Sequence, residues 1–110
     1  MTRERTAVDY IQDIREEITN ISKFSEGIAF DEFKADTMRL YACIRSLEVI
    51  GEAAKNISEE FKKKHPKVPW RKMTGMRDIL IHAYFGTDPK IIWKTITESI
   101  PELEEAIEKI

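Results

Sequence analysis

The sequence predicts an all-α protein, an antiparallel helical bundle of about five to six helices in a single domain of residues 1–110. Two observations predict this fold class. Apolar residues recur at intervals of three and four along the chain, and no segment alternates apolar and polar residues as a strand does. The composition agrees, with 42% hydrophobic and 35% charged residues and only four glycines and four prolines. A chain of this length buries one ordinary core without metal or disulfide support.

The first helix is expected over residues 6–24. Thr6 and Asp9 have the spacing of a capping box, in which the two residues satisfy each other's free backbone donors. Residues 25–27 break the helical pattern, and a short helical turn is expected at residues 31–34. The apolar stripe of the first helix is expected to be Val8, Ile11, Ile14, Ile18 and Ile21.

A second long helix is expected over residues 36–56. Gly51 lies inside it, where glycine costs about 1 kcal/mol relative to alanine, and this suggests a close crossing with another helix. Arg45, Glu48 and Glu52 fall three and four residues apart on another face, as in an exposed row of ion pairs. The apolar stripe of this helix is expected to be Met38, Tyr41, Ile44, Leu47 and Ile50.

The second half of the chain predicts shorter helices. Ser58 is expected to cap one, and an extended connection with two prolines follows at residues 65–69. Gly75 is expected to separate a turn that begins at Trp70 from a helix over residues 76–85 with Gly86 as its C-terminal cap. Asp88 and Pro89 begin a further helix, and the last one is expected to begin near Ser99. The inward residues are expected to be Ile91, Ile92, Ile96, Ile100, Leu103, Ile107 and Ile110.

Several classes of protein lack support in this sequence. No apolar run approaches the length of a membrane span, and the N-terminus has no apolar signal-peptide segment, so we expect a cytoplasmic protein with no membrane partner. The single cysteine, Cys43, is expected to be a small buried hydrophobic residue. There is no Cys/His cluster, phosphate-binding loop or dinucleotide fingerprint, so we expect no metal and no cofactor.

Charge is distributed unevenly along the chain. The net charge is −2, yet the stretch from Phe61 to Arg77 contains seven cations and no carboxylate. Such a stretch is either a solvated loop or a surface that attracts the phosphates of RNA and leads them to Arg77. The candidate RNA-binding residues are Lys62, Lys63, Lys64, Lys67, Arg71 and Lys72.

A short motif, R-x4-H-x-Y, follows this cationic segment at Arg77, His82 and Tyr84. Arginine binds phosphate through a planar fork of donors, and histidine moves protons near neutral pH. A phosphate clamp beside such a base suits metal-independent cleavage of RNA, in which the base takes the proton of a ribose 2′-hydroxyl. Asp78 could fix the tautomer of His82 from one turn away. The expected products carry 2′,3′-cyclic phosphate and 5′-hydroxyl ends.

Helical geometry complicates this motif. Arg77 and Tyr84 lie on nearly one face of a helix, whereas Arg77 and His82 are about 140° apart at 100° per residue. Two arrangements would bring Arg77 and His82 together. Arg77 could lie in a loose turn after Gly75 and reach around the helix. Alternatively, a second protomer could complete the site across a two-fold axis.

The chain resembles the HepT-like branch of the HEPN superfamily, also described as the DUF86 family. The resemblance covers essentially the whole chain and is strongest at residues 45–54 (RSLEVIGEAA), 69–71 (PWR) and 75–86 (GMRDILIHAYFG), with further similarity at residues 91–93 and 100–103. It implies a helical bundle that dimerises with its motifs facing one another, and it leaves open whether dimers pair further.

The resemblance also implies a function. It implies the toxin of a toxin–antitoxin pair, a metal-independent endoribonuclease whose expected substrate is tRNA, with Arg77 and His82 as the catalytic pair and Asp78 in support. The antitoxin would be a minimal nucleotidyltransferase, similar to MntA, that transfers AMP from ATP to Tyr84. AMP on the face shared with Arg77 would block a phosphate site by charge and volume.

Two other interpretations remain open at this point. In the first, the dimer is a non-catalytic subunit that binds a nucleotide or docks the nucleotidyltransferase, and the motif only recognises phosphate. In the second, the chain is a purely structural helical dimer. A further hypothesis is that Glu48 and Glu52 support Arg77 from the neighbouring helix.

Overall fold

The structure, a computed structural model, describes residues 4–82 and 88–110. Every regular element of these residues is helical, which confirms the predicted all-α class. The α-helices are α1 (Ala7–Ser25), α2 (Phe30–Ala35), α3 (Thr37–Asn56), α4 (Glu59–Lys64), α5 (Trp70–His82), α6 (Pro89–Lys94) and α7 (Ile100–Glu108), with a π-helical segment η1 (Thr95–Ser99) between the last two.

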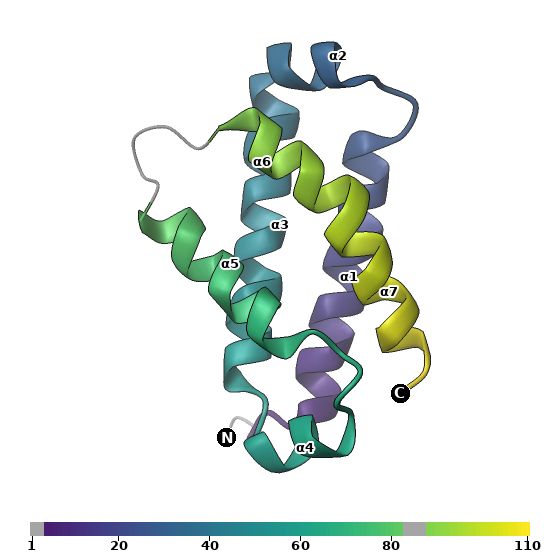
Figure 1. Cartoon of the computed structure of the whole chain (residues 1–110), viewed down its shortest axis with the longest axis vertical. Coiled ribbons are helices and arrows are strands. Elements are labelled where there is room, and N and C mark those ends of the chain that lie inside the picture. Colours follow the sequence, from purple (N-terminus) through teal and green to yellow (C-terminus); the bar gives the residue numbers. More distant parts are fainter. Residues whose placement is uncertain (1–3, 83–87) are drawn as a thin grey trace.

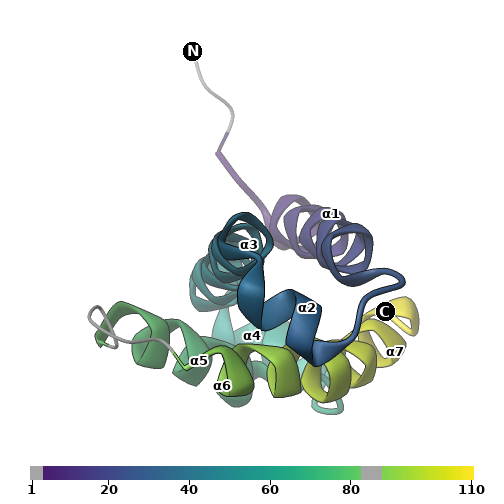
Figure 2. The same ribbon diagram turned by 90° about the horizontal axis from the view of Figure 1, so that it is seen from above.

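The helices form two layers (Figure 2). The long helices α1 and α3 make up one layer, and α5 with the helices from α6 to α7 makes up the other. Figure 1 shows that α1 and α3 run antiparallel, with α2 and α4 at opposite ends of the molecule. Helix α3 packs against both α1 and α5, and α1 also contacts α7, so both long helices hold the two layers together. Within the described residues, no helix is long and apolar enough to cross a membrane.

Helix α1 follows its prediction closely. Its isoleucines are all buried, and the Asp9 carboxylate accepts hydrogen bonds from the backbone N–H of Thr6 at 2.8 Å and from the Thr6 hydroxyl at 3.2 Å. Val8 is the exception, because it is 74% exposed. Its place in the apolar stripe was therefore predicted wrongly, since the spacing gives the direction of a side chain but not whether another element covers it.

The apolar stripe of α3 was only partly correct. Leu47 and Ile50 are buried as predicted, but Met38 and Tyr41 are 84% and 65% exposed. On a helical wheel these two residues project away from the buried side, together with Arg45, Glu48 and Glu52. The buried side of α3 is instead completed by small residues, which let α1 and α5 approach closely: Cys43, Ser46, Gly51, Ala53 and Ala54.

Two short helices close the ends of the bundle. Phe33 of α2 is fully buried, and its ring lies 5.0 Å from that of Trp93 on α6, so α2 covers one end. At the other end, Ser58 caps α4 as predicted, accepting a hydrogen bond from the backbone N–H of Phe61 at 3.2 Å. The Trp70 indole then donates to the His65 carbonyl at 2.9 Å, which ties the proline-containing connection to the start of α5.

Helix α5 corrects the prediction of a break at Gly75. It runs without interruption from Trp70 to His82. Buried Met73 and Leu80 hold it to the rest of the bundle, and this burial outweighs the weak helical propensity of one glycine. Gly75 has open space where a side chain would point, so it fulfils no packing requirement. The predicted end of this helix at Phe85 and its cap at Gly86 lie outside the described residues.

The last helices form one continuous helical rod, not two separate helices. The Asp88 carboxylate accepts a hydrogen bond from the backbone N–H of Lys90 at 2.9 Å, as predicted for a cap. No break occurs at Ser99, because η1 bridges α6 and α7 there. Pro101 cannot donate to the carbonyl four residues earlier, and the wider π turn accommodates that missing bond. Ile91 and Ile110 were expected inward but are 52% and 37% exposed.

The cysteine behaves as predicted. Cys43 is a free thiol in the core, with none of its surface exposed. Burial raises the pKa of Cys43 from 9.0 to about 11, and the nearby Arg39 opposes this shift. The thiol is therefore neutral at physiological pH and contributes to packing.

Candidate active site

Arg77 lies where α5 crosses α3, and Gly51 makes the crossing possible. A Cβ atom at position 51 would collide with the Cβ of Arg77 and would lie 3.1 Å from the carbonyl oxygen of Met73. Only glycine lets the two backbones come this close, which confirms the predicted close crossing. The stem of Arg77 is therefore fixed against α3, and its side chain is only 23% exposed.

Two carboxylates neutralise part of the Arg77 guanidinium. Oε2 of Glu52, on α3, lies 2.5 Å from Nε, and Oδ1 of Asp78 lies 3.5 Å from Nη1. Among the described residues, the remaining nitrogen, Nη2, has no ion-pair partner. The structure therefore places Glu52 in contact with Arg77, as that hypothesis requires. Glu48 does not share this role, because it pairs with Arg45 at 3.5 Å.

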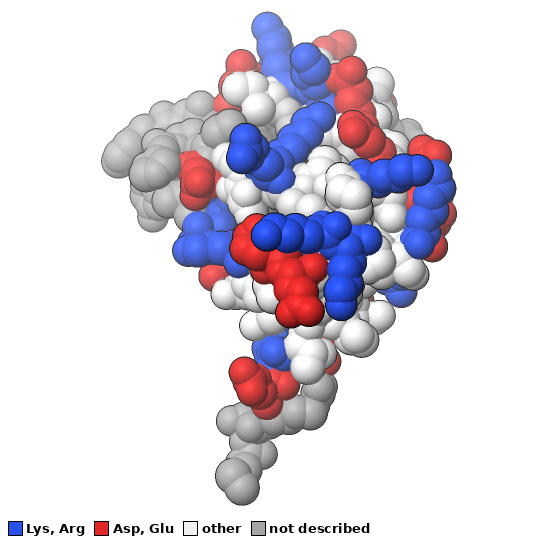
Figure 3. Space-filling view, turned by 60° about the horizontal axis from the view of Figure 1, so that its bottom comes forward, with Lys and Arg blue, Asp and Glu red and all other residues white. Residues whose placement is uncertain are grey.

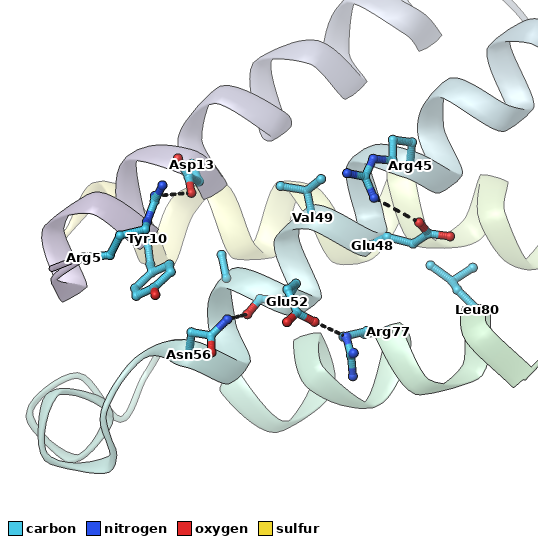
Figure 4. Close-up of a pocket in the computed structure, with 11 residues that line it drawn as sticks. Arg5, Tyr10, Asp13, Arg45, Glu48, Val49, Glu52, Asn56, Arg77 and Leu80 are labelled. Carbon is cyan, nitrogen blue, oxygen red and sulfur yellow. Dashed lines mark hydrogen bonds and ion pairs between the residues drawn. The ribbon is translucent and has the colours of Figure 1, made fainter. Parts of the chain in front are cut away.

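Arg77 borders an open groove of about 610 Å³. Figure 4 shows α3 along the floor, with Tyr10 and Asp13 from α1 on one side and Arg77 and Leu80 from α5 on the other. The groove thus brings together three helices that are distant in sequence.

The α1 side of the groove was not predicted. Arg5 forms an ion pair with Asp13, and its guanidinium lies over the Tyr10 ring, 4.9 Å from the centroid. The groove therefore contains three arginines, each beside a carboxylate, and it is not a uniformly positive surface. No sequence motif links Arg5 and Tyr10 to Arg77, because only folding places them around the same part of α3.

The other residues of the motif are described less fully. His82 is the last residue of α5, and its side chain lies outside what the structure describes. Tyr84 lies outside the described residues as well. The predicted contact of Asp78 with His82 is therefore untested. Since α5 is continuous helix at Arg77, a loose turn after Gly75 does not bring Arg77 towards His82, and that arrangement is wrong.

The cationic segment lies at the α4 end of the molecule and at the start of α5. Three of its lysines have carboxylate neighbours: Lys62 lies 3.5 Å from Glu59, Lys64 lies 3.7 Å from Glu60, and Lys72 lies 3.8 Å from Glu102 of α7. Figure 3 shows the resulting mixture of basic and acidic side chains on this face.

The segment does not form one strip leading to Arg77. Lys72 points towards α7 and lines a different cleft, together with Met76 and Ser99. Lys63, Lys67 and Arg71 have no ion-pair partner among the described residues, and all three are exposed. The ion pair of Lys64 is exposed on both sides and is worth little, so Lys64 remains available to an anion. The Lys62 side chain is only 13% exposed, so it is a poorer RNA-binding candidate than the sequence suggested.

Potential metal ligands are scattered in the part of the chain that the structure describes. No group of three or more His, Cys, Asp or Glu side chains there is arranged to hold a metal ion.

The fold and the groove define a helical domain with a fixed, partly neutralised arginine at the edge of an open groove. Comparison with known proteins gives its family. Residues 14–110 match the family model described as "Ribonuclease HepT-like", so the chain belongs to the HepT-like ribonuclease family. This membership confirms the resemblance found in the sequence and the prediction of an enzyme of the ribonuclease class.

Individual relatives agree with this assignment. The chain is 50% identical, over 97% of both proteins, to a protein of Thermococcus cleftensis named "Probable ribonuclease HepT". It is 46% identical to a "Putative RNase" of Caldanaerobacter subterraneus over 96% of this chain and 95% of the relative. A "Putative RNase" of Methanocaldococcus jannaschii is 40% identical over 96% of both proteins. No solved structure matches the chain.

Proposed function

We propose that this protein is a metal-independent endoribonuclease and the toxin of a toxin–antitoxin pair, with tRNA as its substrate class. The observation that carries the proposal is Arg77, held at the α3–α5 crossing with Nη2 open to an anion. Relatives of this protein are named as ribonucleases. The motif also supplies His82 as a base, five residues after Arg77 on the same helix.

The proposed reaction needs only RNA and two side chains. His82 takes the proton of the ribose 2′-hydroxyl, and O2′ forms a bond to the adjacent phosphorus. The bond from phosphorus to O5′ breaks, and O5′ takes up a proton to become a 5′-hydroxyl. The other fragment ends in a 2′,3′-cyclic phosphate. Arg77 binds the phosphate and stabilises the negative charge that develops on its oxygens.

The active unit is a homodimer in this proposal. Positions five residues apart in a helix lie about 140° apart around its axis, so a two-fold axis is proposed to pair Arg77 of one protomer with His82 of the other. The outward face of α3 suits such an interface, because Met38 and Tyr41 are large, apolar and exposed there.

The proposed antitoxin is a minimal nucleotidyltransferase that adds AMP to Tyr84. Tyr84 follows Arg77 by seven residues, which is two helical turns. A bulky anionic group at that position would exclude the RNA phosphate by charge and volume. Incubation with the nucleotidyltransferase and ATP should increase the intact mass by one or more AMP units, and Tyr84→Phe should prevent this increase.

Cleavage of tRNA in EDTA tests the central proposal. Wild-type protein, shown by intact mass to be unmodified, is incubated with total tRNA beside Arg77→Ala and His82→Ala, both checked for unchanged thermal unfolding. We expect cleavage by the wild type with cyclic-phosphate ends, and losses of about 10²-fold or more in each variant.

Two results would contradict the proposal. Absence of cleavage by unmodified wild type would favour a non-catalytic subunit that binds a nucleotide or docks the nucleotidyltransferase. Equal cleavage by wild type and Arg77→Ala would indicate a contaminating nuclease.

A further inference from the structure

The three ion pairs of the groove are not equivalent. Arg45 and Glu48 lie on the same helix, at 3.5 Å, and the Arg45 side chain is 76% exposed. Arg5 and Asp13 both belong to the N-terminal part of the chain. Of the three pairs, only that between Arg77 and Glu52 joins two helices. It is also closer than the Arg45 pair, at 2.5 Å, and it holds the least exposed of the three arginines.

Arg77 is constrained at two places along its side chain. The backbone of Gly51 packs closely against its Cβ atom, and the carboxylate of the next residue, Glu52, forms an ion pair with its Nε atom. Consecutive residues of α3 therefore fix both the stem and the guanidinium. An arginine that is already held in place loses less conformational freedom when it binds phosphate. Figure 4 shows Glu52 directed from α3 towards Arg77.

The position of Glu52 determines which part of the guanidinium stays available. Nε lies against Glu52 and Nη1 lies nearest Asp78, whereas Nη2 has no partner among the described residues. An RNA phosphate that approaches Arg77 therefore meets Nη2 first. The negative charge of Glu52 also reduces the attraction between Arg77 and that phosphate.

We propose that Glu52 is a positioning residue for RNA cleavage, one that orients Arg77 towards the scissile phosphate at the expense of ground-state affinity. The inference rests on the proposed function, because it assigns a role within the same site. Glu52 touches Arg77 and not the reacting atoms. Its loss should therefore change the rate of the chemical step and the binding of RNA in opposite directions.

The test compares Glu52→Ala and Glu52→Gln with Glu48→Ala and Glu48→Gln, in the full-length protein. Glu48 lies four residues earlier on α3, in the same groove, and pairs with Arg45, so its variants lose the same charge without touching Arg77. Two RNA probes of one sequence are used. One is cleavable, and the other carries a 2′-deoxyribose at the cleavage site, so that binding is measured without reaction.

We expect Glu52→Ala to lower kcat by about tenfold to 10²-fold, because a misdirected Arg77 no longer stabilises the developing charge. The same variant should bind the 2′-deoxy probe about threefold more tightly, since a carboxylate beside Arg77 is gone. Glu52→Gln keeps an oxygen beside Nε and should recover most of kcat. The Glu48 variants control for the loss of one negative charge in the groove, and each should change kcat less than the matching Glu52 variant does.

Each outcome bears on a specific statement. If both Glu52 variants match their Glu48 counterparts in kcat and in binding, Glu52 does not position Arg77. If Glu52→Ala weakens binding and lowers kcat together, Glu52 has only a structural role. If wild type binds the 2′-deoxy probe but cleaves nothing, the proposed function fails and the role of Glu52 in cleavage fails with it, whereas cleavage by wild type with no Glu52 effect overturns only the role of Glu52. Wild type that neither binds nor cleaves overturns both.

Discussion

The two faces of α3 differ although one helix carries both. The face towards the bundle is built from small and aliphatic residues and is almost completely buried. The opposite face carries two exposed apolar residues, Met38 and Tyr41, followed by residues that form ion pairs along a groove. Apolar residues therefore occur on both faces, and hydrophobicity alone does not distinguish the core from a surface available to a ligand or a second protomer.

This difference shows how the helix combines stability with function. Burial on the inner face fixes α3 between α1 and α5, and this rigid position sets where Glu52 and Gly51 meet Arg77. The outer face can then hold exposed charges that contribute little to stability. Substitutions on the two faces should consequently have separate effects, which the following predictions test.

The largest effect is expected from Leu47→Ala. The Leu47 side chain is 1% exposed, and its truncation should lower the free energy of unfolding by about 2–5 kcal/mol through lost burial and a new cavity. Tyr41→Ala, on the outer face, is the comparison and should cost under about 1 kcal/mol within a protomer. Urea unfolding measures both, and any further loss in Tyr41→Ala should depend on protein concentration, because Tyr41 lies in the proposed dimer interface. Similar losses in the two variants that do not depend on protein concentration would contradict this difference between the faces.

A somewhat smaller effect on stability is expected from Gly51→Ala. The new methyl group would collide with the Cβ of Arg77, so α5 must move away from α3, at about 1–3 kcal/mol. RNA cleavage should fall by at least about tenfold because Arg77 moves with α5. Gly75→Ala is the control: open space surrounds that position, and alanine should stabilise the helix by about 0.5–1 kcal/mol. Unchanged cleavage in Gly51→Ala would contradict the proposed importance of the crossing.

A pH-dependent effect is expected from Cys43 on the inner face. Its folded-state pKa is about 11, against 9.0 for the ordinary thiol. Below pH 9 both states keep the proton, so the group adds no pH dependence. Between pH 9 and about 11 the unfolded chain releases the proton first, and stability must fall as pH rises. The stability difference between wild type and Cys43→Ala, measured by urea unfolding under reducing conditions, isolates this effect from other titrating groups. A difference that stays constant up to pH 11 would show that the folded thiol ionises normally.

The smallest effect is expected from Arg45→Ala on the outer face. Arg45 is 76% exposed and its ion pair with Glu48 is 3.5 Å long, so the free energy of unfolding should change by under about 0.5 kcal/mol. Thermal unfolding at low and high salt measures this contribution. A loss above about 1 kcal/mol would indicate that Arg45 is buried against another protomer.

The sequence allowed much of the fold to be predicted because local rules govern it. The caps at Thr6, Ser58 and Asp88 follow from side chains that satisfy free backbone groups, and all three were correct. The break predicted at Gly75 was wrong, because packing of Met73 and Leu80 outweighs propensity at one residue. Local rules also could not show that Met38 and Tyr41 lack a covering helix.

The candidate site was predicted in part. Arg77 could be identified from its motif, because that segment has a recognisable pattern. Support of Arg77 was hypothesised for both Glu48 and Glu52, and only Glu52 contacts it, since Glu48 pairs with Arg45. Arg5, Tyr10 and Asp13 could not be predicted, since nothing in their local sequence relates them to residue 77. Their place in the groove depends on how α1 packs against α3.

The sequence by itself determined the helical class, most helix boundaries, the family and the chemical character of the motif. These properties depend on residues close together in the chain, where hydrophobic spacing and capping act directly. Only the tertiary structure decided that Gly51 packs against the aliphatic part of Arg77 and that Glu52 pairs with its guanidinium. It also decided which face of α3 stays exposed. Those features require helices distant in sequence to meet, and the energy of their packing is not visible in any single segment.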